Sequence, residues 1–149
     1  MAELPEGHRR ALLEVAAVLE ERRIPFGVGG SCMLALLGLP ITVGDLDVLV
    51  PVGVEPPDLP WPTRVPDLDP GPISSDWILR STVSGVPVDL ISGMRVDTGN
   101  EALEIPFSGG GVADVSGTEV ALSVPDAWVA LYNHHKPERA ALLADHLGR

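Results

Sequence analysis

Apolar and polar residues follow a helical spacing near both ends of the chain. From His8 to Arg23, apolar residues recur every three or four positions and Glu and Arg occupy many of the positions between them, which is typical of an amphipathic helix. Toward the other end, Pro125 suits the first turn of a helix that continues over residues 126–134, and Pro137 opens a second helix that reaches Leu147. The pattern predicts one helix at the start of the chain and two at its end.

Short apolar runs in the middle of the chain predict strands. Residues 45–50 are apolar at nearly every position apart from two acidic ones, which indicates a strand buried on both faces. Runs over 76–83 and 86–91 flank Ser84-Gly85, a pair that favours a two-residue hairpin turn. The other predicted strands cover residues 25–28, 101–107 and 112–122, with a flexible hairpin tip at 108–111.

Two further segments carry turn residues. Gly29-Gly30 predicts a tight turn, with Ser31 as the N-cap of a short helix over 32–37 that ends at Gly38. Residues 51–72 contain eight prolines and show little periodicity, so they predict a long surface loop. The resulting order of helices and strands is typical of an α/β or α+β layered fold. A length of 149 residues fits a single domain over 1–149.

The composition limits the classes of partner. With 10 Lys and Arg against 21 Asp and Glu, the formal net charge is −11, which repels nucleic acid at long range. Small nucleotides stay compatible, because bound divalent cations reverse the local sign of the charge. No apolar run approaches the roughly 18–20 residues of a membrane span, the acidic N-terminus lacks the basic start of a signal peptide, and the lone Cys32 forms no internal disulfide. We therefore expect a cytoplasmic protein without a membrane partner.

Three aspartates lie in apolar strands. Asp45 and Asp47 are two residues apart, so their side chains leave the same face of a strand, and a carboxylate pair of this kind suits Mg²⁺ or Mn²⁺. Asp89 is a lone acid in its strand and needs a partner, because burying an unpaired carboxylate is costly. If the two strands lie side by side, Asp89 completes a cluster of three carboxylates, as a metal ligand or as the base for an attacking hydroxyl.

The turn Gly29-Gly30-Ser31 supplies a complementary feature. Glycines let a backbone approach a ligand closely, and the amides at the start of the following helix point toward an anion. The Ser31 hydroxyl adds a further donor. A triphosphate chelated by metal ions is a ligand that suits such a turn.

Gly29-Gly30-Ser31, a short helix, Asp45-Leu46-Asp47 and the later Asp89 together resemble the polymerase-β-like nucleotidyltransferase superfamily. The resemblance is closest to its small bacterial members, toxin-type ones included. It implies a mixed β-sheet flanked by helices, with further helices at the C-terminus. It also implies that Asp45, Asp47 and Asp89 bind Mg²⁺ or Mn²⁺, and that Gly29, Gly30 and Ser31 hold the phosphates of a nucleoside triphosphate such as ATP. In the C-terminal helices, Lys136 or Arg139 would contact the triphosphate.

This resemblance implies transfer of a nucleoside monophosphate from the triphosphate to a hydroxyl acceptor. The acceptor is open between a small molecule and tRNA, the latter in a toxin–antitoxin pair with an antitoxin-like protein partner; the negative charge weighs against unaided tRNA binding. Toxin-type members commonly carry an Arg and a Thr shortly before Asp-x-Asp, whereas those positions here hold Ile41 and Val43, with Thr42 one residue out of place. The alternative is a catalytically impaired nucleotide- or metal-binding module that acts through a partner.

Several other residues have simpler interpretations. Cys32 has no paired base in the pattern, so we expect a small packed residue. His134 and His135 are adjacent and therefore face different sides of a helix, which favours a helix-end effect over metal binding. The three tryptophans are expected to anchor the core or the loops.

Overall fold

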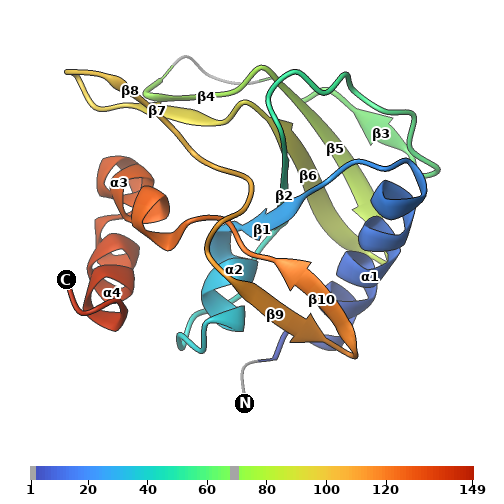
Figure 1. The fold of residues 1–149 in the computed structure, drawn as a ribbon, viewed down its shortest axis with the longest axis horizontal. Helices are drawn as coiled ribbons and strands as arrows, with labels where there is room; N and C mark the ends of the chain where they lie inside the picture. Colours follow the sequence, from blue (N-terminus) through green and yellow to red (C-terminus); the bar gives the residue numbers. More distant parts are fainter. Residues whose placement is uncertain (1–2, 68–70) are drawn as a thin grey trace.

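The computed structural model describes residues 3–67 and 71–149. Its largest sheet consists of β1 (Gly27–Gly29), β2 (Leu46–Val50), β3 (Thr63–Arg64), β5 (Trp77–Val83) and β6 (Val86–Ser92). These strands lie in the order β1-β2-β6-β5-β3 (Figure 1). β2 runs parallel to β6, while the other neighbouring strands are antiparallel. The sheet is therefore mixed.

Four helices occur in these described ranges: α1 (Glu6–Glu21), α2 (Gly30–Leu36), α3 (Pro125–His135) and α4 (Pro137–His146). α1 packs against β5 and β6, and α2 packs against β1 and β2. Figure 1 shows α3 and α4 packed together on the side of the molecule opposite α1. The mixed α+β architecture predicted from the sequence is confirmed, with helix boundaries that differ from the predicted ones by about two residues.

The first two helices end in the same way. In α1 the backbone N–H of Ile24 bonds to the Leu19 carbonyl, and Arg23 takes a left-handed conformation with φ of 57°. In α2 the N–H of Leu39 bonds to the Leu34 carbonyl, and Gly38 takes a φ of 92°. Both are Schellman motifs, in which a left-handed residue ends the helix and satisfies its last carbonyls. The predicted stop at Gly38 is confirmed.

The two hairpins confirm one predicted turn and correct another. Ser84-Gly85 joins β5 to β6 as expected, with positive φ at both residues. The predicted hairpin tip at 108–111 is wrong. Strands β9 (Val112–Val115) and β10 (Thr118–Ala121) instead turn at Ser116-Gly117. Residues 109–111 run beside Leu122 and Ser123, where an added Cβ on Gly110 would lie 1.9 Å from the Ser123 carbonyl oxygen. These glycines permit close backbone packing.

A three-stranded antiparallel sheet lies beside the main one. It contains β4 (Ile73–Ser74), β7 (Arg95–Asp97) and β8 (Ala102–Glu104), in the order β4-β7-β8. Part of the predicted strand over 101–107 forms β8, whereas β4 and β7 had no clear sequence signal. The predicted surface loop over 51–72 is mostly irregular where it is described, apart from β3, and its residues 68–70 lie outside the described ranges.

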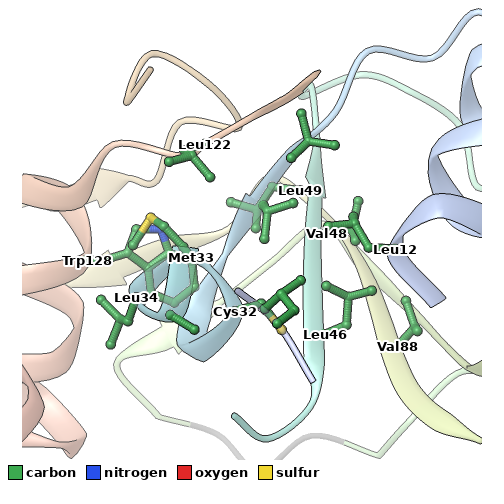
Figure 2. Close-up of a cluster of buried hydrophobic side chains, with 14 of the residues drawn as sticks. Leu12, Cys32, Met33, Leu34, Leu46, Val48, Leu49, Val88, Leu122 and Trp128 are labelled. Carbon is green, nitrogen blue, oxygen red and sulfur yellow. The ribbon is translucent and has the colours of Figure 1, made fainter. Parts of the chain in front are cut away.

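The hydrophobic core joins the helices to the main sheet. Figure 2 shows buried side chains from α1, α2, β2 and β6 gathered with Leu122 and Trp128. Trp128, on α3, is only 2% exposed and donates its indole N–H to the Ser123 hydroxyl at 2.8 Å. This contact fixes the start of α3 against β1, because the Ser123 amide also bonds to the Val28 carbonyl. No helix among the described residues is long and apolar enough to cross a membrane.

Candidate functional site

The parallel pairing of β2 and β6 brings two of the predicted site aspartates together. Asp47 and Asp89 are direct partners across these strands, and Gly29 of β1 is the partner of Asp47 on its other side. Directly paired residues in a sheet point to the same face. The condition set by the sequence, that the two acid-bearing strands lie side by side, is therefore confirmed.

The glycine turn is shaped by two side chains that press against it. A Cβ added at Gly30 would lie 2.3 Å from Oδ2 of Asp47, and Gly30 also has a positive φ of 61°. A Cβ added at Gly29 would lie 2.3 Å from the ring of Trp128. Glycine is required at both positions for steric reasons. The turn consequently holds the Asp47 carboxylate against α2 and Trp128 against β1.

Ser31 does not cap the helix as predicted, because α2 already begins at Gly30 and the N-cap position is Gly29. The buried Ser31 hydroxyl instead accepts a hydrogen bond from the Gly44 amide at 2.9 Å. This bond ties the segment before Asp45 to α2. The hydroxyl hydrogen is not used in that bond, so it stays available to an acceptor in the adjoining cavity.

A cavity of about 320 Å³ opens between the N-terminal end of β2 and the α3–α4 pair. A volume of this size accommodates one small-molecule ligand. Asp45 and Asp47 both line it, as the predicted same-face arrangement requires. Lys136 lines the cavity as well. The remaining lining residues are Ser31, Thr42, Val43, Gly44, Ile73, Met94, Trp128, Leu131, Tyr132, His135 and Arg139.

The electrostatic environment of Asp47 is unfavourable to its charge. The pKa of the Asp47 carboxyl is raised to about 7, first by burial and then by the neighbouring Asp89 and Asp45 carboxylates. Lys136 and Arg80 oppose this effect only in part. A carboxylate kept in such surroundings is one that a bound cation would stabilise strongly.

In the part of the chain that the structure describes, Asp89, unlike Asp47, has a partner of opposite charge. It is 7% exposed and forms a two-point ion pair with Arg80, whose Nε and Nη2 donate to its two oxygens at 2.7 and 2.9 Å. It does not line the 320 Å³ cavity. Within residues 3–67 and 71–149, no group of three His, Cys, Asp or Glu side chains is arranged to hold a metal ion. The partner that a buried Asp89 needs is therefore an arginine in this structure.

The opposite wall of the cavity is formed by the junction of α3 and α4. Lys136 lies between the two helices, and the Arg139 guanidinium sits 5.5 Å from the centre of the Tyr132 ring. The Tyr132 hydroxyl is buried and makes no hydrogen bond with any described residue. Burial raises its pKa to about 12, so it is a donor at neutral pH. This wall therefore offers cations and a hydroxyl donor, facing the two carboxylates of β2.

Sequence reasoning missed the roles of Arg80, Trp128 and Tyr132 in this region. Arg80 could have been found by counting back from the Ser84-Gly85 turn, because a two-residue hairpin loop makes residues 80 and 89 direct partners. Trp128, Tyr132 and Lys136 are spaced four apart and so share one face of a helical segment. The steric role of Trp128 at Gly29 depends on tertiary packing and had no sequence signal.

Cys32 behaves as the sequence predicts. It is fully buried, and burial raises the pKa of its thiol to about 12, with the Asp47 and Asp45 charges adding to the effect. A thiol in this state is a packed side chain rather than a nucleophile. The pKa of His135 is lowered by burial, so this histidine is neutral at pH 7, and no metal cluster includes it among the described residues.

The donor set of the cavity fits a hard divalent cation through Asp45 and Asp47. Mg²⁺ is commonly bound by one or two carboxylates, with waters and substrate phosphates completing its coordination. Asp45 is exposed, and in the described ranges no ion pair engages the Asp47 carboxylate. Asp89 fits less directly, because both of its oxygens are held by Arg80.

Comparison with known proteins supports the fold. No protein-family model matches the chain, and no curated protein matches it in sequence. Among solved structures, the chain is similar to that of a candidate nucleotidyltransferase from Thermotoga maritima, with a TM-score of 0.62 and 16% sequence identity. The similarity covers 98% of this chain and 96% of that one. The chain therefore has a nucleotidyltransferase-like fold.

Proposed function

We propose that this protein is a Mg²⁺-dependent nucleotidyltransferase that moves a nucleoside monophosphate from a nucleoside triphosphate to a hydroxyl acceptor. The observation that carries the proposal is the pairing of Asp47 with Asp89 on parallel strands, with Asp47 packed on the Gly29-Gly30 turn and facing the cavity. The nucleotidyltransferase-like fold of the Thermotoga maritima protein is consistent with it.

The cavity suits a metal-bound triphosphate on chemical grounds. When bound, Mg²⁺ would neutralise the phosphate charges and raise the electrophilicity of the reacting phosphorus. Asp45 and Asp47 would hold it, while Lys136 and Arg139 would attract the phosphate oxygens from the other wall. The Tyr132 hydroxyl, which makes no hydrogen bond with the described part of the chain, and the remaining hydrogen of Ser31 would serve as donors to the ligand.

The chain also supplies rigidity around the reacting groups. Trp128 packed on Gly29 and the bond from Gly44 to Ser31 fix the two segments that carry the β2 carboxylates. Asp89, held by Arg80, would act as a metal ligand or as the base for the acceptor hydroxyl through the lone pairs that this ion pair leaves free.

One observation bears on the alternative, a nucleotide- or metal-binding module without turnover. The positions that carry Arg and Thr in toxin-type nucleotidyltransferases hold Ile41 and Val43 here, which motivates the module. Thr42, however, lines the cavity, so a hydroxyl-bearing residue exists close to the missing ones. We therefore favour the enzyme over the module.

The nature of the acceptor is a separate part of the proposal. A formal charge of −11 disfavours unaided binding of tRNA, so a small hydroxyl-bearing molecule is the better acceptor. A toxin–antitoxin role with an antitoxin-like partner would require that partner to bring tRNA to the site. We expect the reaction to take place in the cytoplasm.

The test is transfer of label from nucleoside triphosphates labelled on the α-phosphate, in the presence of Mg²⁺ and a set of hydroxyl acceptors. We expect transfer by the wild type and none by Asp45→Ala combined with Asp47→Ala, whereas Asp58→Ala, which changes an exposed acid of the proline-rich loop, keeps the activity. Transfer by the double variant would exclude these carboxylates from the reaction. Tight triphosphate binding in calorimetry without any transfer would favour the module.

A further inference from the structure

A row of charged residues crosses the main sheet from the cavity to its far edge. Asp47 of β2 is the partner of Asp89 of β6, Asp89 is the partner of Arg80 of β5, and Arg80 is the partner of Arg64 of β3. Because direct partners point to the same face, these four side chains lie on one face of the sheet. Two acids are followed by two arginines in consecutive strands.

The two arginines are arranged at an electrostatic cost. Like charges directly opposite each other on paired strands are destabilising. Asp89 compensates the charge of Arg80. Within residues 3–67 and 71–149, no ion pair or side-chain hydrogen bond engages Arg64. Among the described residues, no partner therefore compensates the positive charge of Arg64 in this strongly acidic protein.

A second cavity lies over this pair. It measures about 380 Å³ and is lined by Arg64, Arg80, Thr63, Ser81 and Thr82, together with two prolines. None of the acidic residues that the structure describes lines it. The Arg80 side chain is 33% exposed, so it can contact a ligand while it holds Asp89. Guanidinium groups recognise phosphate oxygens through two parallel hydrogen bonds.

We propose that Arg64 and Arg80 form the binding site for an anionic group, of phosphate type, on the acceptor molecule. This inference rests on the proposed nucleotidyltransferase function, and it assigns the acceptor to the face of the sheet beyond Asp89. Adjacent strands are about 4.8 Å apart, so the arginines lie on the order of 10–14 Å along the sheet from Asp47. A small phosphorylated molecule spans that separation, with its phosphate on the arginines and its hydroxyl near the aspartates.

The small size of the acceptor follows from the charge distribution. A polyanion such as tRNA would contact a wide area of the surface, where the net charge of −11 repels it. A compact anion contacts only the two guanidinium groups, which attract it. β3 is only two residues long and forms the edge of the sheet, so the site is open to solution on one side.

The test uses inorganic phosphate as the probe and the backbone amide NMR signals of the full chain as the readout. Titration of the wild type should shift the amides of β3 and β5, and Arg64→Gln should weaken this binding about tenfold. Arg64→Lys should restore part of it. Arg22→Gln, an equal change of charge at an exposed arginine at the end of α1, should leave it unchanged.

The outcomes separate this inference from the proposed function. Shifts confined to α3 and α4, or shifts at β3 that Arg64→Gln does not weaken, would overturn the anion site while leaving nucleotidyl transfer intact. Phosphate binding at Arg64 in a protein that neither binds nor turns over any nucleoside triphosphate would overturn the acceptor assignment together with the proposed function. Binding of tRNA that depends on Arg64, without binding of phosphate, would overturn the assignment to a small acceptor.

Discussion

Replacing Asp47 by Asn should stabilise the ligand-free protein at alkaline pH. The pKa of the Asp47 carboxyl is about 7 in the folded protein, against an ordinary value of 3.8. Between these values the folded chain keeps a proton that the unfolded chain has lost, so stability falls as the pH rises toward 7 and is level above it. From pH 5 to pH 8 this loss amounts to about 3 kcal/mol. Asn has the same shape without the charge and removes that loss.

Urea unfolding at pH 5 and pH 8, with EDTA present to remove divalent cations, measures the effect. The wild type should lose about 3 kcal/mol between the two values, Asp47→Asn should lose much less, and the control Asp58→Asn should follow the wild type. Added Mg²⁺ should stabilise the wild type at pH 8 and have little effect on Asp47→Asn. Equal pH dependence in the wild type and Asp47→Asn would refute the assignment of an unfavourably buried charge to this aspartate.

Three other substitutions test the surroundings of the site by urea unfolding at pH 7. Gly30→Ala should cost about 3 kcal/mol or more, because its Cβ would overlap a carboxylate, whereas Gly38→Ala, which has a positive φ but no contact, should cost about 1 kcal/mol; equal costs would argue against the overlap. Arg80→Met should cost about 3 kcal/mol by leaving Asp89 buried without its partner, and adding Asp89→Asn should recover part of that loss. Tyr132→Phe should be neutral or stabilising by up to about 1 kcal/mol, since its hydroxyl has no described partner; a loss above about 2 kcal/mol would contradict this.

The sequence predicted those parts of the fold that depend on local patterns. The periodicity of α1, the proline at the first turn of α3 and the glycine after α2 are signals carried within a few residues. The Ser84-Gly85 turn likewise specified the β5–β6 pairing. The sequence did not predict the parallel pairing of β2 with β6, because contacts between strands far apart in sequence leave no local signal.

Where sequence reasoning was wrong, tertiary contacts decided the outcome. Ser31 has the chemistry of an N-cap, but α2 begins at Gly30, two residues earlier than predicted, where Asp47 lies close to the backbone, and the serine hydroxyl accepts a hydrogen bond from Gly44 instead. Residues 109–111 have the composition of a flexible tip, but Gly110 is held against the Ser123 backbone. In both cases a distant segment packs so closely against the backbone that only glycine, which has no Cβ, fits there.

The site itself was predicted in part. Asp45, Asp47, Ser31 and Lys136 line one cavity, as expected for residues that act together. Their roles toward a metal ion and a nucleotide stay predictions, as does the role of Asp89. The sequence indicated that a buried Asp89 needs a partner, because burying an unpaired carboxylate is costly. The identity of that partner, Arg80, follows from the strand register that the Ser84-Gly85 turn sets.

The most direct measurement is a crystal structure of the protein with Mn²⁺ and a non-hydrolysable nucleoside triphosphate, with the anomalous signal of the metal recorded. Mn²⁺ replaces Mg²⁺ at oxygen-rich sites and can be located without ambiguity. We expect an anomalous peak within coordination distance of the Asp45 and Asp47 carboxylates, with the triphosphate extending toward Lys136. A bound triphosphate whose metal lies away from both aspartates, or a nucleotide bound outside the 320 Å³ cavity, would contradict the proposed site.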